Sequence, residues 1–199
     1  MKKLSTREFV LLALLVAILI VLAYVNIPQP AGLSITFNMI PVAIAAIAIG
    51  PLGGAIIGGA FGIISFLQCF GICGFSGMGA ALAAVNPFLA FVQRFFPRLL
   101  DGLLLGFIYR FMHNKANAYV GSAVTGFMAA FLNTLFFMTS LVWIFGGTEY
   151  MQNSMAGRGM LTYIVAAVGL NGVVEMIVST VLTGAIGSAL YKAGFVKKQ

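Results

Sequence analysis

Long runs of apolar residues cover most of this chain and constrain its fold more than any other feature. Hydrophobic residues make up 61% of the 199 residues and charged residues only 8%, against roughly 25% in an ordinary soluble domain. So few charges cannot cover a water-facing surface, and most of the chain must therefore lie in lipid. Because a spanning helix needs about 20 apolar residues, the runs predict an all-α integral membrane protein.

Six transmembrane helices are predicted, in a single membrane domain that covers residues 1–199. Proline, glycine and polar residues interrupt the apolar runs and mark the ends of the helices. The expected spans are about 8–25, 39–49, 51–69, 87–112, 117–144 and 160–191. Between them, residues 26–38 and 146–159 are expected to form loops, and residues 70–86 a loop with a partial helix.

The basic residues at the ends of the apolar runs predict the orientation. Six spans place both termini on one side, and cytoplasmic flanks are enriched in Lys and Arg. If both termini are cytoplasmic, Arg158 is the only one of these flanking basic residues on the outer side of the membrane. The residues then placed in the cytoplasm are Lys2, Lys3, Arg7, Arg110, Lys115, Lys192, Lys197 and Lys198. This distribution is typical of an orientation signal, so the net charge of +7 does not indicate nucleic-acid binding.

Four acidic or basic residues lie in the interior of predicted spans, away from the span ends. Arg94, Arg98 and Asp101 are spaced i, i+4, i+7, which places them on one face of their helix, and Glu175 lies in the last span. A charge at the centre of a bilayer costs about 2.5–3.5 kcal/mol on insertion scales. Such residues face the protein interior and usually mark functional sites.

A shared depth connects Arg98 with two asparagines. Arg98, Asn133 and Asn171 each lie about 11 residues from the expected outer end of their span, or roughly 16 Å at the rise of an α-helix. One interpretation is a ligand site in which Arg and Asn bind an anion or an amide. The alternative is a structural network in which Asp101 neutralises Arg98 and Glu175 bonds to Asn133.

Motifs of the common catalytic and metal sites are missing. The sequence contains no phosphate-binding loop, no H-E-x-x-H and no G-x-S-x-G. Cys69 and Cys73 lack further ligands nearby, and the only histidine is His113. We therefore expect no metal and no cofactor. A small membrane-embedded enzyme stays an alternative, with Asp101 and Glu175 as its only candidate acid–base pair.

Glycines at four-residue spacing predict close helix packing. Gly54, Gly58 and Gly62 form two consecutive GxxxG steps, and Gly102 and Gly106 form another. Such small faces let helix backbones approach each other in lipid.

Short motifs, taken in their order along the chain, resemble the substrate-binding S component of energy-coupling factor (ECF) transporters. The match is closest to the pantothenate-type members. The motifs are Ile40-Pro41-Val42 through Gly50-Pro51, Ser65-Phe66-Leu67-Gln68, Cys69-Phe70-Gly71, Asn86-Pro87, Pro97-Arg98-Leu99-Leu100-Asp101-Gly102, Asn133-Thr134, and Asn171 with Glu175. Leu132 departs from the pattern, since the family often has Thr before the asparagine of that helix.

The resemblance implies a division of labour in a bacterial plasma membrane. The chain would bind a vitamin, with pantothenate favoured, from the outside, while a membrane coupling subunit and two cytosolic ATPases supply the energy. The substrate-binding residues implied are Arg94, Arg98, Asn133, Asn171, Glu175, Gln68 and Asn86. Another vitamin, such as riboflavin or a thiamine precursor, and a purely structural membrane partner are the remaining alternatives.

The resemblance also implies a docking face on the first helix. The family docks its coupling subunit through an Ala-x-x-x-Ala face, and Ala13 and Ala17 have this spacing. Two alanines on one face permit close packing against another helix. Packing inside this same chain is the alternative interpretation.

Overall fold

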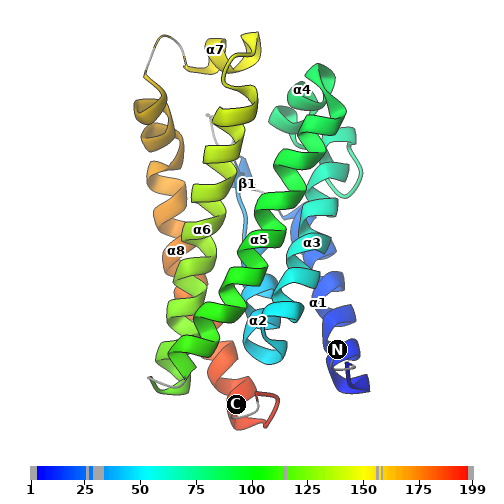
Figure 1. Cartoon of the computed structure of the whole chain (residues 1–199), viewed down its shortest axis with the longest axis vertical. Helices are drawn as coiled ribbons and strands as arrows, with labels where there is room; N and C mark the ends of the chain where they lie inside the picture. Colours follow the sequence, from blue (N-terminus) through cyan, green and yellow to red (C-terminus); the bar gives the residue numbers. More distant parts are fainter. Residues whose placement is uncertain are drawn as a thin grey trace.

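Helices make up nearly all of the computed structural model, which describes residues 4–25, 27–28, 34–113, 116–155, 157 and 159–196. The elements in chain order are α1 (Thr6–Tyr24), β1 (Ile27–Pro28), β2 (Ser34–Ile35), α2 (Met39–Ile49), α3 (Pro51–Leu67), the 3₁₀ helix η1 (Gln68–Phe70), α4 (Gly77–Val85), α5 (Pro87–His113), α6 (Ala118–Phe145), α7 (Glu149–Met155) and α8 (Met160–Lys192). Figure 1 shows an elongated bundle with both chain termini at one end, here called the terminal end. The opposite end carries α4 and α7 and is called the distal end.

Local sequence explains where several helices begin. Ser5 and Glu8 form a capping box at the start of α1, with the backbone N–H of Ser5 donating to the Glu8 carboxylate over 2.6 Å. The side chain of Asn117 caps α6 in a similar way. Gly50 separates α2 from α3 with a φ of 92°, a conformation that glycine adopts without steric cost.

The long helices agree with the predicted segments to within two residues at each end, apart from α3, whose last turn continues as η1. Among the described residues, four segments are long and apolar enough to cross a membrane, namely Thr6–Tyr24, Pro51–Phe70, Ala118–Phe145 and Gly172–Lys192. α5 has 27 residues but carries several charges. α2 has 11 residues, or about 16 Å, which is half the thickness of the hydrocarbon core.

The connections differ in part from the prediction. The expected loop at 26–38 contains a short antiparallel pair in which Ile27 lies opposite Ile35. The loop with a partial helix at 70–86 is confirmed by α4. The prediction of a plain loop at 146–159 is wrong, because α7 forms there and buries Met151 and Met155. These methionines are spaced i, i+4, so one apolar face folds onto the bundle.

Most of the basic residues that predicted the orientation lie outside the described part of the chain. They are Lys2, Lys3, Lys115, Arg158, Lys197 and Lys198. The shared position of the two termini at one end is visible in Figure 1, and it agrees with an even number of spans.

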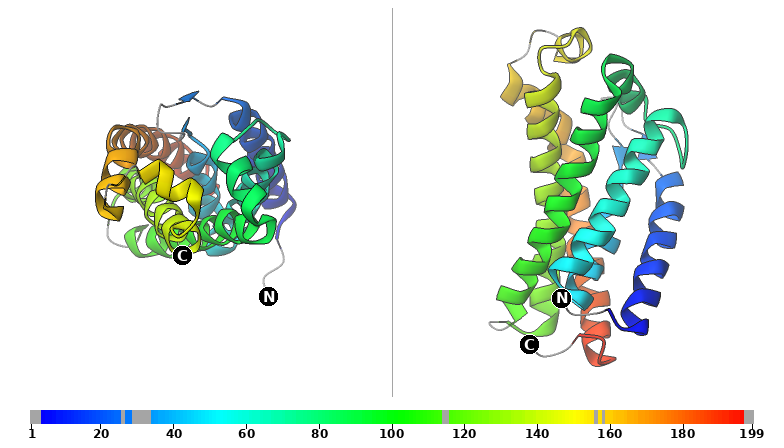
Figure 2. Two further views of the ribbon diagram at one scale, coloured as in Figure 1. Left: turned by 90° about the horizontal axis from the view of Figure 1, so that it is seen from above. Right: turned by 45° about the vertical axis from the view of Figure 1, so that its right-hand side comes forward.

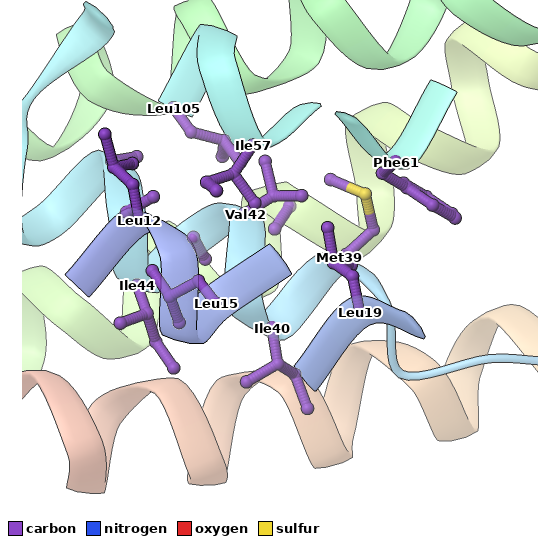
Figure 3. Packing of buried hydrophobic residues seen from close by; sticks show 14 of the residues in the cluster. Leu12, Leu15, Leu19, Met39, Ile40, Val42, Ile44, Ile57, Phe61 and Leu105 are labelled. Atoms are coloured by element: carbon purple, nitrogen blue, oxygen red, sulfur yellow. The ribbon is translucent and has the colours of Figure 1, made fainter. Parts of the chain in front are cut away.

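The apolar core surrounds α2. Nine of its eleven residues are buried, and the helix contacts α1, α3, α5, α6 and α8. Figure 3 shows Val42 of α2 among Leu12 of α1, Ile57 of α3 and Leu105 of α5. A second buried cluster occupies the distal end, where Met78 of α4 and Met151 of α7 join residues of α5 and α6.

Glycines join α3 to α5, as predicted. A Cβ atom on Gly58 would overlap the backbone carbonyl oxygen of Arg98, and one on Gly62 would lie 2.8 Å from the Cα atom of Phe95. Gly54 and Gly102 meet backbone to backbone in the same way. The two helices lie side by side in both views of the bundle (Figures 1 and 2). This contact fixes the position of the polar face of α5 relative to α3.

Candidate functional site

One face of α5 buries polar side chains in the interior of the bundle. Gln93 and Asp101 are fully buried, and Arg94 and Arg98 are 4% and 6% exposed. Pro97 lies inside the helix on the same face, and it has no N–H to donate to the carbonyl of Gln93. This stretch of α5 is therefore rich in polar groups that the bilayer cannot solvate.

Arg94 is held from two directions. Its Nη1 donates to the Ser65 hydroxyl over 2.9 Å and to the Ser65 carbonyl over 3.4 Å, and its Nη2 donates to the Ser76 hydroxyl over 3.1 Å. A Cβ on Gly79 would lie 2.7 Å from Nη2, so the missing side chain leaves room for the guanidinium group. Ser65 lies in the last turn of α3 and Ser76 caps α4, so these two helices fix the guanidinium group of Arg94.

Arg98 lies between polar and aromatic contacts. Its Nη1 donates to the backbone carbonyl of Arg94 over 2.8 Å. Its Cζ lies 4.6 Å from the ring centroid of Phe61 on α3 and 5.1 Å from that of Phe137 on α6. The Phe137 ring is also 5.8 Å from the Cζ of Arg94. Both guanidinium groups therefore face the same aromatic side chain.

Several buried polar atoms around these arginines have no hydrogen-bond partner among the described residues. They are Nε of Arg94, Nε of Arg98, both carboxylate oxygens of Asp101, both amide atoms of Gln93, and Oδ1 of Asn133 and of Asn38. Buried polar groups are nearly always paired in folded proteins. Asp101 accepts no hydrogen bond from Arg98 in the part of the chain that the structure describes.

Glu175 and Asn171 are the predicted site residues of α8, and the structure describes the side chain of Glu175. Oε1 of Glu175 accepts a hydrogen bond of 2.7 Å from the backbone N–H of Thr36. This bond ties the segment between β2 and α2 to α8. Asn171 lies within α8, and its side chain is outside the described residues.

Gln68 and Asn86 have structural partners. Nε2 of Gln68 donates to the carbonyls of Ala23 and Cys73, over 3.1 and 3.2 Å, and so ties α1 to the loop after η1. Oδ1 of Asn86 accepts from the backbone N–H groups of the second and third residues of α5, over 3.0 and 3.1 Å. It thereby caps the helix that carries both arginines.

The two alanines of α1 face outward. Ala13 and Ala17 are exposed, whereas Leu12, Leu15 and Leu19 form the buried face of the helix. α1 itself lies at one edge of the bundle (Figure 2). In the described part of the chain, the alanine face is therefore not buried against another helix.

Sequence reasoning missed several residues around the arginines. Ser65, Ser76, Phe61 and Asn38 lie in segments far from α5 along the chain, and nothing in their local sequence indicates a shared site. Gln93 was detectable, because it is a polar residue inside a predicted span and lies eight residues before Asp101. That spacing places both on the same helix face.

The chemistry of this region suits an organic anion. A guanidinium group donates two parallel hydrogen bonds to a carboxylate, and Phe61 and Phe137 offer apolar surface beside the charge. In the described part of the chain, no group of three His, Cys, Asp or Glu side chains is arranged to hold a metal ion. The available contacts are therefore charge-assisted hydrogen bonds and aromatic packing.

Comparison with known proteins gives a consistent result. The family model described as "ECF transporter, substrate-specific component" matches residues 7–187. The chain is 32% identical over 164 residues to the "Pantothenate transporter PanT" of Leuconostoc mesenteroides, covering 80% of this chain and 76% of that protein. It is also 29% identical over 205 residues to the "Pantothenic acid transporter PanT" of Lactococcus lactis, covering 97% of this chain and 98% of that protein.

Proposed function

We propose that this chain, which belongs to the family of substrate-specific components of ECF transporters, binds pantothenate at the site formed around Arg94 and Arg98. Membership of the family makes the chain the vitamin-binding component of an importer, not an enzyme, and a multi-pass protein of a bacterial membrane. Two relatives carry the name of a pantothenate transporter, and this supports the choice of vitamin.

The observation that carries the proposal is the pair of buried guanidinium groups facing Phe137. Pantothenate has one carboxylate, one amide and two hydroxyl groups on a short carbon chain. Arg98 would bind the carboxylate, and Arg94, fixed by Ser65 and Ser76, would share its charge. Asn133, which lies one helical turn from Phe137, would bond the amide or a hydroxyl group, and Asn171 would do the same from α8.

Glu175, Gln68 and Asn86 would then act indirectly. Glu175 would hold the segment before α2 against α8, Gln68 would hold the loop after η1, and Asn86 would hold the start of α5. Each role rests on the hydrogen bonds described above. All three residues would shape the site without contacting the vitamin.

The membrane arrangement is part of the proposal. The single domain of residues 1–199 would cross the bilayer six times, with α2 and the segment before it counted as one crossing, and would have both termini in the cytoplasm. Arg94 and Arg98 lie in the distal half of α5, so pantothenate would enter from outside. Ala13 and Ala17 would contact a membrane coupling subunit, and two cytosolic ATPases would supply the energy.

Calorimetric binding to the purified chain in detergent tests the vitamin. We expect tight one-to-one binding of pantothenate and none of riboflavin or thiamine at the same concentrations. Tight binding of another vitamin would leave the family assignment intact and would overturn the choice of pantothenate as the substrate. No binding of any vitamin would favour a purely structural role.

Labelling of single cysteines on intact cells tests the orientation. Gln152 of α7 and Ala193 after α8 are exposed at opposite ends of the bundle. Each is replaced by Cys in a chain in which Cys73, which has a φ of 58°, is changed to Gly. An impermeant thiol reagent should label position 152 and spare position 193. The reverse pattern would overturn the orientation.

A further inference from the structure

Three residues with buried oxygen acceptors come from different segments of the chain, on the terminal side of the arginines. They are Asp101 on α5, Asn133 on α6 and Asn38 directly before α2, and none of these acceptors has a hydrogen-bond partner among the described residues. Asp101 is fully buried and Asn38 is 2% exposed. Leaving such a group unpaired costs about 1–3 kcal/mol, and more for a charge, so packing alone does not explain them.

Asp101 of α5 and Asn133 of α6 lie at a similar height along the long axis of the bundle. Asp101 follows Arg98 by three residues, or about 4.5 Å toward the terminal end. Asn133 precedes Phe137 by four residues, and because α6 runs in the opposite direction, it lies about 6 Å toward the same end. Phe137 contacts Arg98. Both residues therefore lie about one helical turn from the contact between Arg98 and Phe137, on the side of the terminal end.

Asn38, the residue directly before α2, is connected to the same arginine–aromatic contact through its neighbour in the chain. Met39, its neighbour, belongs to the same buried cluster as Phe61, and Figure 3 shows the Met39 side chain extending toward Phe61. Phe61 in turn lies 4.6 Å from the guanidinium carbon of Arg98. Two residues earlier, Thr36 is anchored to Glu175. α2 contacts both α5 and α6, the helices that carry the two other residues.

We propose that Asp101, Asn38 and Asn133 form the second end of the binding site and select a ligand by its hydroxyl and amide N–H donors. This inference rests on the proposed function, because it takes the carboxylate of the ligand to lie at Arg98. The distal end of the site offers guanidinium donors, and the end formed by Asp101, Asn38 and Asn133 offers oxygen acceptors. A ligand therefore fits in one direction only, since its carboxylate pairs with the guanidinium groups and its hydroxyl and amide N–H donors pair with the oxygen acceptors.

The inference singles out Asp101 as a specificity-determining residue. Its carboxylate has room for several hydrogen bonds and accepts from O–H and N–H groups alone. A site built to accept hydrogen bonds discriminates strongly against an analogue that lacks the donors, because its own polar groups are then left unpaired. A purely structural Asp101, serving only as a countercharge to Arg98, would weaken all anionic ligands equally when altered.

The test compares pantothenate with an analogue in which both hydroxyl groups are replaced by hydrogen. Calorimetry measures the ratio of the two dissociation constants for wild type, Asp101→Asn and Asn38→Ala. Wild type should prefer pantothenate by about tenfold or more, and each variant should reduce that preference to about threefold or less. Asn38 makes no capping hydrogen bond to its own helix, so Asn38→Ala provides the test if Asp101→Asn does not fold.

Thr125→Val is the matched control. Thr125 is a fully buried polar residue two turns from Asn133 on the same face of α6, and its hydroxyl donates to the carbonyl of Gly121 over 2.8 Å. Its variant should keep the wild-type ratio. A wild type that binds both ligands equally, or folded variants that keep the full preference, would overturn the inference and leave the proposed function intact. A wild type that binds neither ligand would overturn the proposed function itself.

Discussion

α2 and α5 both bury side chains in the interior of the bundle, but these side chains are of opposite kinds. α2 is covered by apolar contacts along nine of its eleven residues. α5 buries Gln93, Arg94, Arg98 and Asp101 along one face. Apolar packing explains α2 completely, whereas each charge in α5 costs about 2.5–3.5 kcal/mol in a membrane. The comparison therefore supports our proposal that the polar face of α5 binds a ligand.

The strongest test of this difference places a charge on α2. Val42 is fully buried among apolar side chains, so Val42→Asp creates an unpaired buried charge. We expect it to destabilise the chain by about 3–5 kcal/mol or to prevent folding, as measured by thermal unfolding and size exclusion in detergent. Val42→Ala removes two methyl groups and should stay folded with a loss of about 1–3 kcal/mol. A stable Asp variant would show that α2 tolerates charge as well as α5 does.

A smaller effect is expected at the support of Arg94. Ser65→Ala removes the 2.9 Å hydrogen bond to its guanidinium group. A bond to a charged group contributes about 1.5–3 kcal/mol, so pantothenate affinity should fall about tenfold or more while the chain stays folded. Ser154→Ala is the control, because this exposed serine bonds only to the carbonyl of Tyr150 on its own helix. Unchanged affinity in Ser65→Ala would remove Arg94 from the binding site.

Substitutions on the exposed face of α1 are expected to have the smallest effect on the stability and the pantothenate affinity of the isolated chain. Ala13 and Ala17 are exposed, so replacing both by Leu should change stability and pantothenate affinity by less than about 0.5 kcal/mol. Uptake by cells that contain the whole transporter should nevertheless collapse, because added bulk separates the docking helices. Leu14→Phe with Ile18→Phe adds bulk at two exposed positions of α1 that lie about 100° around the helix from the alanines, and this variant should preserve uptake. A matching loss of binding in the alanine variant would contradict a docking role.

The fold was largely predictable because its signals are local. Apolar run length and the placement of Pro87 locate the long helices, and the spacing of Gly54, Gly58 and Gly62 predicts the contact with α5 that the structure shows. α7 was missed because its apolar face consists of two methionines in a short polar stretch. Such a pattern becomes a helix only when the end of the bundle is present to bury it.

The candidate site was predictable only in part. Arg94 and Arg98 were identified because charge inside an apolar run is conspicuous and costly. The partners of Arg94 come from α3 and α4, and their serines look ordinary in the sequence. Conversely, Gln68 and Asn86 were expected to bind substrate, but their hydrogen bonds hold backbone segments. The direction in which a polar side chain points depends on tertiary contacts that no local pattern encodes.

The role of Arg98 is the central claim, and calorimetry of pantothenate binding tests it most directly. Wild type is compared with Arg98→Lys, which keeps the charge and loses the planar fork, and with Arg98→Ala. Breaking a buried charge-assisted pair costs roughly 2–5 kcal/mol, so Arg98→Ala should lose affinity about 30-fold or more and Arg98→Lys should also bind more weakly than wild type. Arg110→Lys, the same change near the terminal end of α5, should bind as wild type does. A folded Arg98→Ala that binds pantothenate as tightly as wild type would contradict the account.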